Sequence, residues 1–400
     1  MLPMLLSAVI MLASFFSTSS LRDAVTGGVP ADVSFMTPAL YIALSPLSRL
    51  FDIIGLLSIG QHVAFVTTIV GAAALFSAAR PRGARRRSMR GLMSAGIFFA
   101  LIAVAYALAI ALPRPLTALA VAHRDWVRVD FHSHTNASRD ARKSFDPEDN
   151  RAWHRAGGFD VAYVSDHSSF SGAEAALTGN PQRAGDGTVL LSAYEGRYRG
   201  LFMIFLGLSR ADSAALLDSH RWLRAANLRS GRLPASVVAI PGPLIDVQRE
   251  ARDGPPRIVA MELVDGSPKG FTQHDHDRAE IISRADSLDI ALVAGSNNHG
   301  WGRVVPAWTM VRIPGWQGLS ADSLGAEIVR VLRADPRGAV RLVERHRPSP
   351  TSLAGFAITV PAFAVQTLAQ LTFLERVAWV VWLWLIAFVA HRMRVRRTQP

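Results

Sequence analysis

The sequence of 400 residues contains no cysteine, which excludes disulfide bonds as a source of its stability. A cysteine-free chain suits an oxidising compartment without demanding one. Lysine is almost absent as well, because only Lys143 and Lys269 occur among the 43 basic residues. We attribute this preference for arginine to genome composition and not to function. The chain also lacks internal repeats and low-complexity segments.

Charged residues make up only 18% of the chain and hydrophobic residues 50%, and the mean hydropathy is +0.22. This composition is too apolar for an ordinary soluble enzyme, and the apolar excess lies at the two ends of the chain. Residues 91–112 carry no charge over 22 positions, enough to cross a hydrocarbon core of about 30 Å. Residues 62–79 predict a second span, and residues 374–391, with tryptophans suited to a membrane interface, predict a third.

Two more apolar segments lie near the N-terminus. Residues 1–17 could be a cleaved signal peptide, but no basic residue precedes them and no clear small-x-small cleavage site follows. We therefore expect an uncleaved membrane helix there. Residues 38–61 are long enough to span, although Arg49 and Asp52 interrupt them, and apolar positions recur at helical spacing from Leu47. This pattern favours an interfacial amphipathic helix over 44–60, within an N-terminal membrane region covering 1–122.

The formal net charge of +12 is concentrated beside the predicted spans. Residues 80–90 contain six arginines and residues 391–397 contain four. Such clusters are typical of cytoplasmic flanks, with attraction to anionic lipid as a compatible addition, so we expect a lipid bilayer and no nucleic acid as partner. With both clusters inside, the protein is a multi-pass membrane protein whose central region lies outside the cytoplasm and whose C-terminus lies within it.

The central region, residues 123–350, alternates short apolar runs with helix-like stretches. This rhythm predicts an α/β domain with a parallel sheet or barrel, inserted between transmembrane helices. In such folds the chemistry lies where strands end and loops begin. Residues 351–400 follow as an amphipathic segment and the last span with its basic tail. We expect residues 353–376 to lie at the outer membrane surface and to run continuously into that span.

Polar residues follow four of the predicted strands. His132 and His134 end the run 126–131 and share one face of it, because side chains alternate along a strand. The residues expected at one rim are His132, His134, Asp140, Asp166, His167, Glu195, Asn297, Asn298 and His299. Each alone could cap a loop or face water, but four strand ends together favour a metal site. Imidazoles and carboxylates are the ligand set for Zn, Mn or Fe.

Three segments resemble the PHP (polymerase and histidinol phosphatase) domain family: "DFHSHTNASRDA", "GFDVAYVSDHS" and "AGSNNHG". The resemblance implies a distorted β/α barrel that hydrolyses phosphoesters with up to three divalent metals. By position it implies that the metal ligands are His132, His134, His167, Glu195 and His299, with Asp140 a further candidate. Asp166 is implied to orient or bridge. Arg197 and Arg199 follow Glu195, where guanidinium groups could hold a substrate phosphate, the alternative being a solvated loop.

The sequence departs from the family pattern at two positions. Ile240 precedes Pro241 where the family has a histidine, and Asn297 replaces an aspartate. Losing an imidazole and a carboxylate predicts one or two bound ions (Mn, Zn or Fe) instead of three. Glu262 ends a strand and could supply a carboxylate or simply meet solvent. A second His-x-His, at residues 274–276, precedes a helix-like stretch, so we expect it to cap that helix and face solvent.

Two function classes remain open. The first is a membrane-anchored, metal-dependent phosphoesterase acting on a phosphorylated substrate. The second is a catalytically reduced domain that binds a metal or an anion as a sensor. A transporter is disfavoured, because its spans should carry intramembrane polar sites and the clearer spans here have almost none.

Overall fold

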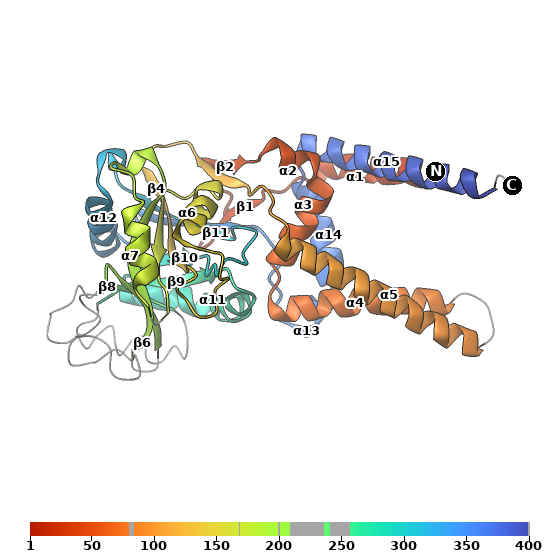
Figure 1. The fold of residues 1–400 in the computed structure, drawn as a ribbon, viewed down its shortest axis with the longest axis horizontal. Coiled ribbons are helices and arrows are strands. Elements are labelled where there is room, and N and C mark those ends of the chain that lie inside the picture. Colours follow the sequence, from red (N-terminus) through yellow and green to blue (C-terminus); the bar gives the residue numbers. More distant parts are fainter. Residues whose placement is uncertain (80–83, 168, 199–200, 209–235, 241–256, 399–400) are drawn as a thin grey trace. The chain divides into compact units, whose positions relative to one another are not determined.

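A computed structural model of the chain describes residues 1–79, 84–167, 169–198, 201–208, 236–240 and 257–398 (Figure 1). The chain forms two compact units. The first, a helical unit, comprises Met1–Ser20, Thr37–Pro115 and His346–Pro400. The second, an α/β unit, comprises Leu21–Met36 and Leu116–Arg345.

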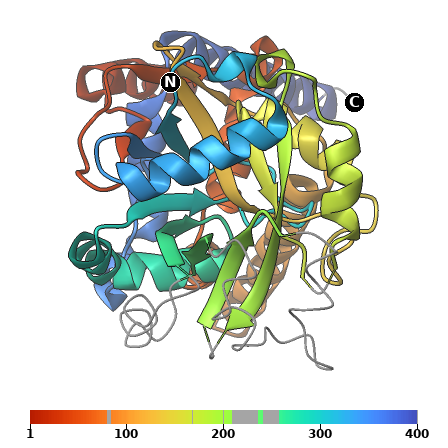
Figure 2. The ribbon, with the colours of Figure 1, turned by 90° about the vertical axis from the view of Figure 1, so that its left-hand side faces the viewer.

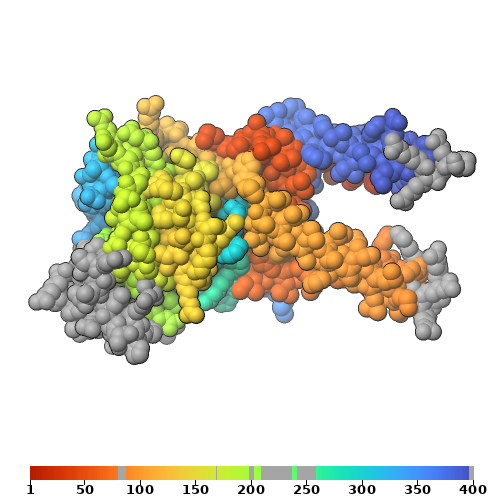
Figure 3. All heavy atoms as spheres, in the orientation of Figure 1, coloured from red at the N-terminus to blue at the C-terminus, as the bar shows by residue number. Residues whose placement is uncertain are grey.

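The helical unit contains three helices that are long and apolar enough to cross a membrane. They are α4 (Ile59–Ala79), the Arg87–Ala111 part of α5 (Ala84–Ala111), and the Phe373–Val395 part of α15 (Phe373–Thr398). They largely coincide with three of the four segments for which the sequence predicts membrane helices, whereas the fourth, residues 1–17, contains only a shorter apolar helix, Leu2–Phe16. The remaining helices are α1 (Leu2–Leu12), η1 (Ala13–Phe16), α2 (Ala39–Ala43), α3 (Ser45–Gly55), α13 (Leu353–Ala357) and α14 (Thr359–Gln370). Figure 3 shows α5 uncovered along much of the viewed face. Leu92 and Ile97 of this helix are exposed.

The amphipathic segment 44–60 packs through its polar face within the helical unit. In α3, Ser45, Ser48 and Asp52 are buried, and Asp52 accepts a hydrogen bond from the Tyr41 hydroxyl at 2.7 Å. Arg49 of the same helix forms an ion pair with Glu375 at 2.8 Å. The charges that interrupt this segment in the sequence are therefore paired inside the unit.

The segment leading into the last span is not one continuous helix, so the sequence prediction for residues 353–376 is wrong in this respect. Helix α14 ends at Gln370, and Leu371 has an extended backbone with ψ of 132°. The next helix begins with a capping box: the Glu375 carboxylate accepts from the Thr372 amide at 2.9 Å, and the Thr372 hydroxyl accepts from the Glu375 amide at 3.3 Å. This reciprocal cap starts a new helix where the pattern predicted continuity.

The described part of the α/β unit contains twelve strands and six helices, counting the short 3-10 helices. The strands are β1 (Leu21–Asp23), β2 (Val33–Met36), β3 (Ala118–Val121), β4 (Trp126–Ser133), β5 (Val161–Val164), β6 (Val189–Tyr198), β7 (Leu201–Leu206), β8 (Ser236–Ala239), β9 (Arg257–Asp265), β10 (Ala291–Gly295), β11 (Ala307–Arg312) and β12 (Val340–Arg345). The helices are α6 (Pro147–Ala156), α7 (Ser171–Thr178), η2 (Ala184–Asp186), α11 (Pro268–Leu288), η3 (Trp316–Gly318) and α12 (Ala321–Ala334).

Ten of these strands form one mixed sheet, in the order β1-β12-β11-β4-β5-β6-β7-β8-β9-β10. The pairs β4–β5, β5–β6, β8–β9 and β9–β10 are parallel, and helices α6, α7 and α11 connect three of them. The sheet curls until β10 reaches β4 (Figure 2), where the Asn297 amide donates to the His132 carbonyl at 2.8 Å. The predicted α/β architecture, a distorted barrel, is confirmed.

The N-terminal residues 21–36 belong to the α/β unit, although the sequence boundary placed this domain at 123–350. Strand β1 pairs with β12, and β2 pairs with β3, both antiparallel. Leu21, Leu116 and Leu119 are buried in one cluster with Trp308, whose side chain is fully buried. The unit is thus completed by a segment that lies about 80 residues before its main part in the chain.

Candidate metal centre

Strand β4 carries the first two histidines into the interior of the curled sheet. The strand extends through Ser133, and His132 and His134 are 1% and 0% exposed. Their ring centroids lie 5.0 Å apart. Because two residues separated by one position share a strand face, the local backbone brings both imidazoles to one place.

Three further chain segments bring polar side chains to the same place. His167 follows β5, His299 follows β10, and Glu195 comes from β6. The sequence placed Glu195 at a strand end, but β6 continues to Tyr198 and pairs there with β7. Glu195 therefore projects from within a strand. Its Oε2 lies 3.0 Å from His132 Nε2, 3.4 Å from His134 Nε2 and 3.3 Å from His167 Nδ1.

The hydrogen bonds of His134 determine which of its nitrogens carries a lone pair. The Ser138 hydroxyl donates its proton to Asp166 at 2.8 Å, so its oxygen can only accept from His134 Nδ1 at 3.2 Å. Nδ1 therefore carries the hydrogen and Nε2 the lone pair. Buried Nε2 has no hydrogen-bond partner among the described residues. It faces the carboxylate oxygen of Glu195, so two electron-pair donors point at one another.

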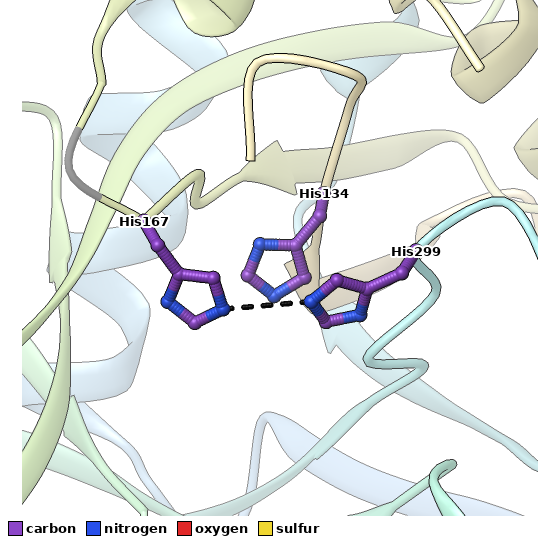
Figure 4. Close-up of side chains that lie close together, drawn as sticks. All are labelled: His134, His167 and His299. Atoms are coloured by element: carbon purple, nitrogen blue, oxygen red, sulfur yellow. Dashed lines mark hydrogen bonds between the residues drawn. The ribbon is translucent and has the colours of Figure 1, made fainter. Parts of the chain in front are cut away.

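His299 is oriented in the same manner. Its Nδ1 donates to the carbonyl of Asn297 at 3.0 Å, which leaves the lone pair on Nε2. That nitrogen lies 3.4 Å from Asp140 Oδ1 and 3.4 Å from Nε2 of His167. Figure 4 shows the rings of His134, His167 and His299 converging from three segments. Ligand atoms from these three histidines lie within 4.8 Å of one another, as do those of His132, His134 and Glu195.

The centre becomes more exposed from its base to its rim. His132, His134 and Glu195 are buried, the side chains of His299 and His167 are 18% and 32% exposed, and that of Asp140 is 63% exposed. The side chains of this group that are most exposed to solvent are therefore those of Asp140 and His167.

His132 lies between two buried carboxylates. Its Nε2 faces Glu195. Its Nδ1 lies 3.1 Å from Oε1 of Glu262, a fully buried residue of β9. Gly295 of β10 packs directly against both His132 and Glu262, and a Cβ at this position would collide with them. Only glycine allows β10 to approach so closely.

The electrostatics of the centre follow from burial and from these pairs. Burial alone lowers the pKa of His132, but the charges of Glu262 and Glu195 outweigh it and hold that pKa well above its ordinary value. Burial and the neighbouring imidazoles lower the pKa of His134, and burial lowers that of His299. Burial also raises the pKa of Glu262 to about 7. The pKa of Glu195 is lowered, because the imidazoles outweigh the effect of its burial.

Asp166 holds the loop after β4 in place. Its carboxylate accepts from the amide and hydroxyl of Thr135, at 2.7 and 2.6 Å, and from the Ser138 hydroxyl. Burial raises its pKa despite these hydrogen bonds. Ser138 in turn accepts from the His167 amide at 3.0 Å. Through Ser138, Asp166 is thus connected by hydrogen bonds to His134 and to the start of the loop carrying His167.

Of the two arginines that the sequence nominated for phosphate contact, the structure describes Arg197. Arg197 is exposed, and its guanidinium lies 4.2 Å from the ring centroid of Phe202. Arg199 lies outside the described residues. Ile240, at the position where a histidine was expected, packs against the apolar core of the unit.

A second polar group lies next to His132, and of its members sequence reasoning considered only Glu262 as a possible carboxylate donor; Glu262 is buried within β9 and does not meet solvent. Glu262, Asp265 and His274 are all buried, and one ligand atom from each lies within 4.8 Å of the others. The expectation that His274 caps a helix and faces solvent is wrong, because α11 already begins at Pro268 and is capped by Ser267. His274 consequently lies in the second turn, facing inward. His276 does face solvent, with its side chain 77% exposed.

Asp130 and His154 were also missed. Asp130 accepts from the amides of His132 and Ser296, at 3.1 and 2.9 Å, and so joins β4 to the end of β10. Its other oxygen lies 2.8 Å from His154 Nε2 on α6. Nothing in the local pattern marks His154, because its partner lies 24 residues earlier in the chain.

Comparison with known proteins finds similarity at the level of fold. No family model matches the chain. No curated protein matches its sequence. PsfC from Pseudomonas syringae is 13% identical, with 61% of this chain and 98% of that chain covered and a TM-score of 0.38.

Two other solved structures are similar to the chain. A two-domain protein from Bacteroides vulgatus, described as containing a predicted PHP-like metal-dependent phosphoesterase, is 15% identical over 58% of this chain and 70% of its own, with a TM-score of 0.34. A protein from Bifidobacterium adolescentis described as a metal-dependent phosphoesterase is 16% identical over 50% and 95%, with a TM-score of 0.30. At these values the likenesses assign no activity.

Proposed function

We propose that the α/β unit is a divalent-metal-dependent phosphoesterase anchored to a membrane by the helical unit. The observation that carries this proposal is the buried lone pair of His134 Nε2, which faces Oε2 of Glu195 at 3.4 Å without a hydrogen-bond partner among the described residues. Two buried electron-pair donors in this arrangement are unfavourable unless a cation lies between them. The residues present therefore fit a divalent ion.

Two overlapping ligand sets support one or two ions of the Zn, Mn or Fe type. His132, His134 and Glu195 form the buried set, and His134, His167 and His299, with Asp140 at the rim, form the more open one. A divalent cation bound there supplies a Lewis acid that neutralises phosphoryl charge and acidifies water. The open rim beside Asp140 suits a ligand that exchanges with solvent.

The surrounding residues determine which ring nitrogen of His134 and of His299 carries the hydrogen. Asp166, through Ser138, keeps the hydrogen of His134 on Nδ1, and the Asn297 carbonyl does the same for His299. Both histidines thus present Nε2 to the centre without having to reorient when an ion binds. Arg197, exposed on β6, supplies positive charge for the substrate phosphate.

The alternative is a catalytically reduced domain that binds a metal or an anion as a sensor. Ile240 favours it, because this apolar side chain packs into the core where the resemblance implies a metal-binding histidine. A sensor and an enzyme differ in turnover and not in metal binding. Hydrolysis therefore decides between them.

The test is the full-length variant His132→Ala/His134→Ala, with His276→Ala as the control. We expect the double variant to lose its bound Zn, Mn or Fe and any hydrolysis of a panel of phosphomonoesters and phosphodiesters. The control, in which an exposed histidine is removed, should retain both. Metal content is measured by elemental analysis and turnover by phosphate release.

Two outcomes count against the enzyme. A wild-type chain that binds metal yet hydrolyses none of the esters after reconstitution with each ion would leave the sensor. A wild-type chain that remains free of metal after the same reconstitution would remove the enzyme and leave only a sensor that binds an anion.

A further inference from the structure

A second group of ligand-type side chains lies on the far side of His132 from Glu195. It consists of Glu262 and Asp265 from β9 and His274 from α11, which are 0%, 7% and 2% exposed. One ligand atom from each lies within 4.8 Å of the others. None of these three residues belongs to the ligand sets of the proposed phosphoesterase centre.

Two atoms of this group are buried without a hydrogen-bond partner among the described residues: Oε2 of Glu262 and Nδ1 of His274. A buried carboxylate oxygen and a buried imidazole nitrogen that lack hydrogen-bond partners are atoms that a bound cation would satisfy.

Within the described part of the chain, His132 is the basic side chain that pairs with this group, and it is shared with Glu195. Oε1 of Glu262 is paired with His132, but no described arginine or lysine forms an ion pair with Glu262 or Asp265. Asp265 instead accepts from the amide of Ser267 at 2.8 Å and from Nδ2 of Asn297 at 3.2 Å. Two adjacent buried carboxylates are costly unless they are protonated or bind a cation.

We propose that Glu262, Asp265 and His274 bind a divalent cation of their own, separate from the centre around His134. Two carboxylates and one imidazole suit Mn²⁺ best, because carboxylates favour Mg²⁺, Ca²⁺ and Mn²⁺ while imidazole favours transition metals. The side-chain nitrogen of Asn297 donates to Oδ2 of Asp265 at 3.2 Å and so lies beside this group. The centre around His134 is richer in imidazole and better suited to Zn or Fe.

The two sites are joined by one side chain. Nδ1 of His132 contacts Oε1 of Glu262, while its Nε2 contacts Glu195 in the other site. Glu262 therefore binds the Mn²⁺ through one oxygen and orients a ligand of the neighbouring centre through the other. The Mn²⁺ site supports the position of His132 without contacting substrate.

The experiment counts Mn²⁺ on the full-length, metal-stripped protein by electron paramagnetic resonance titration. The variant is His274→Leu, and the matched control is His276→Leu, two residues away on the same helix but exposed. We expect His274→Leu to bind one Mn²⁺ fewer per chain, or to bind it about tenfold or more weakly. The control should match wild type, and the nitrogen coupling of one imidazole to Mn²⁺ should vanish only in His274→Leu.

A second variant covers the case in which His274→Leu fails to fold. Asp265→Asn preserves size and should lose the same Mn²⁺. The double variant His134→Ala/His299→Ala should keep it while losing ions from the other centre, so the two sites are counted separately. If His274→Leu and Asp265→Asn, both folded, bind Mn²⁺ with wild-type number and affinity, the proposed site does not exist. That result would leave the phosphoesterase proposal intact.

Discussion

The carboxylate of Asp166 touches neither His134 nor His167, yet it orients both. It accepts the proton of Ser138, and Ser138 then accepts from His134 Nδ1 and from the amide of His167. The direction of the buried lone pair on His134 follows from this chain of hydrogen bonds. Asp166 is therefore a positioning residue for the centre.

We predict that Asp166→Asn weakens metal binding about 10-fold to 100-fold, because the loss of a residue that orients ligands typically has this effect. The charge-assisted bonds from Thr135 and Ser138 would also be lost, so unfolding should become easier by about 1–3 kcal/mol. Competition with a chelator measures the first effect and thermal unfolding the second. Asp186→Asn, at an exposed carboxylate, is the control. Unchanged metal affinity in Asp166→Asn would contradict the positioning role.

At the scale of elements, the α/β unit depends on β1 and β2, two strands that precede the first long apolar helix in the sequence. Strand β2 pairs with β3 so that Met36 lies opposite Ala118, although residues 37–117 separate them in sequence. Leu21 and Leu119 are buried at 4% and 0% exposure in the same cluster as Trp308. Each such leucine contributes roughly 1.5–3 kcal/mol by its burial.

We predict that a fragment covering 123–350 fails to fold stably, because it lacks β1, β2 and β3 and exposes that cluster. A second fragment, in which residues 21–36 are joined to 116–345 by a short turn, should be soluble and fold cooperatively. The antiparallel β2–β3 pair makes this connection a simple hairpin. Thermal unfolding and dye binding to exposed apolar surface compare the two. Equal stability of the two fragments would show that residues 21–36 are dispensable.

At the scale of the whole molecule, three helices have the length and apolarity to cross a membrane, and two arginine clusters flank them in sequence. The positive-inside rule then predicts a cytoplasmic location for both clusters and an extracytoplasmic one for the α/β unit. This orientation is a proposal about sidedness that a protease can test.

We predict that trypsin added to intact spheroplasts cleaves after Arg183, which is exposed in the loop between α7 and β6. Arginines in residues 80–90 should be protected until the membrane is lysed. Mass spectrometry of the released peptides identifies the cleavage sites. Cleavage at Arg183 only after lysis would place the α/β unit inside the cell and reverse the proposed topology.

Much of the molecule could be predicted from the sequence, because the decisive signals there are local. An uncharged run of 22 residues is sufficient to indicate a helix long enough to span a membrane. Alternation along residues 126–134 is sufficient to place His132 and His134 on one strand face. The α/β class likewise follows from the rhythm of apolar runs. In each case the physical cause lies within one segment of backbone.

Only the tertiary structure decided the inward orientation of His274, the hydrogen bonds that connect Asp166 to His134, and the membership of residues 21–36 in the α/β unit. His274 looked like a helix cap because its neighbours are acidic, but Ser267 caps that helix seven residues earlier. Its burial depends on β9 lying beneath α11, and the unpartnered lone pair of His134 depends on Ser138, Asp166 and a strand 60 residues away. These features are set by contacts between segments distant in sequence, which no local pattern contains.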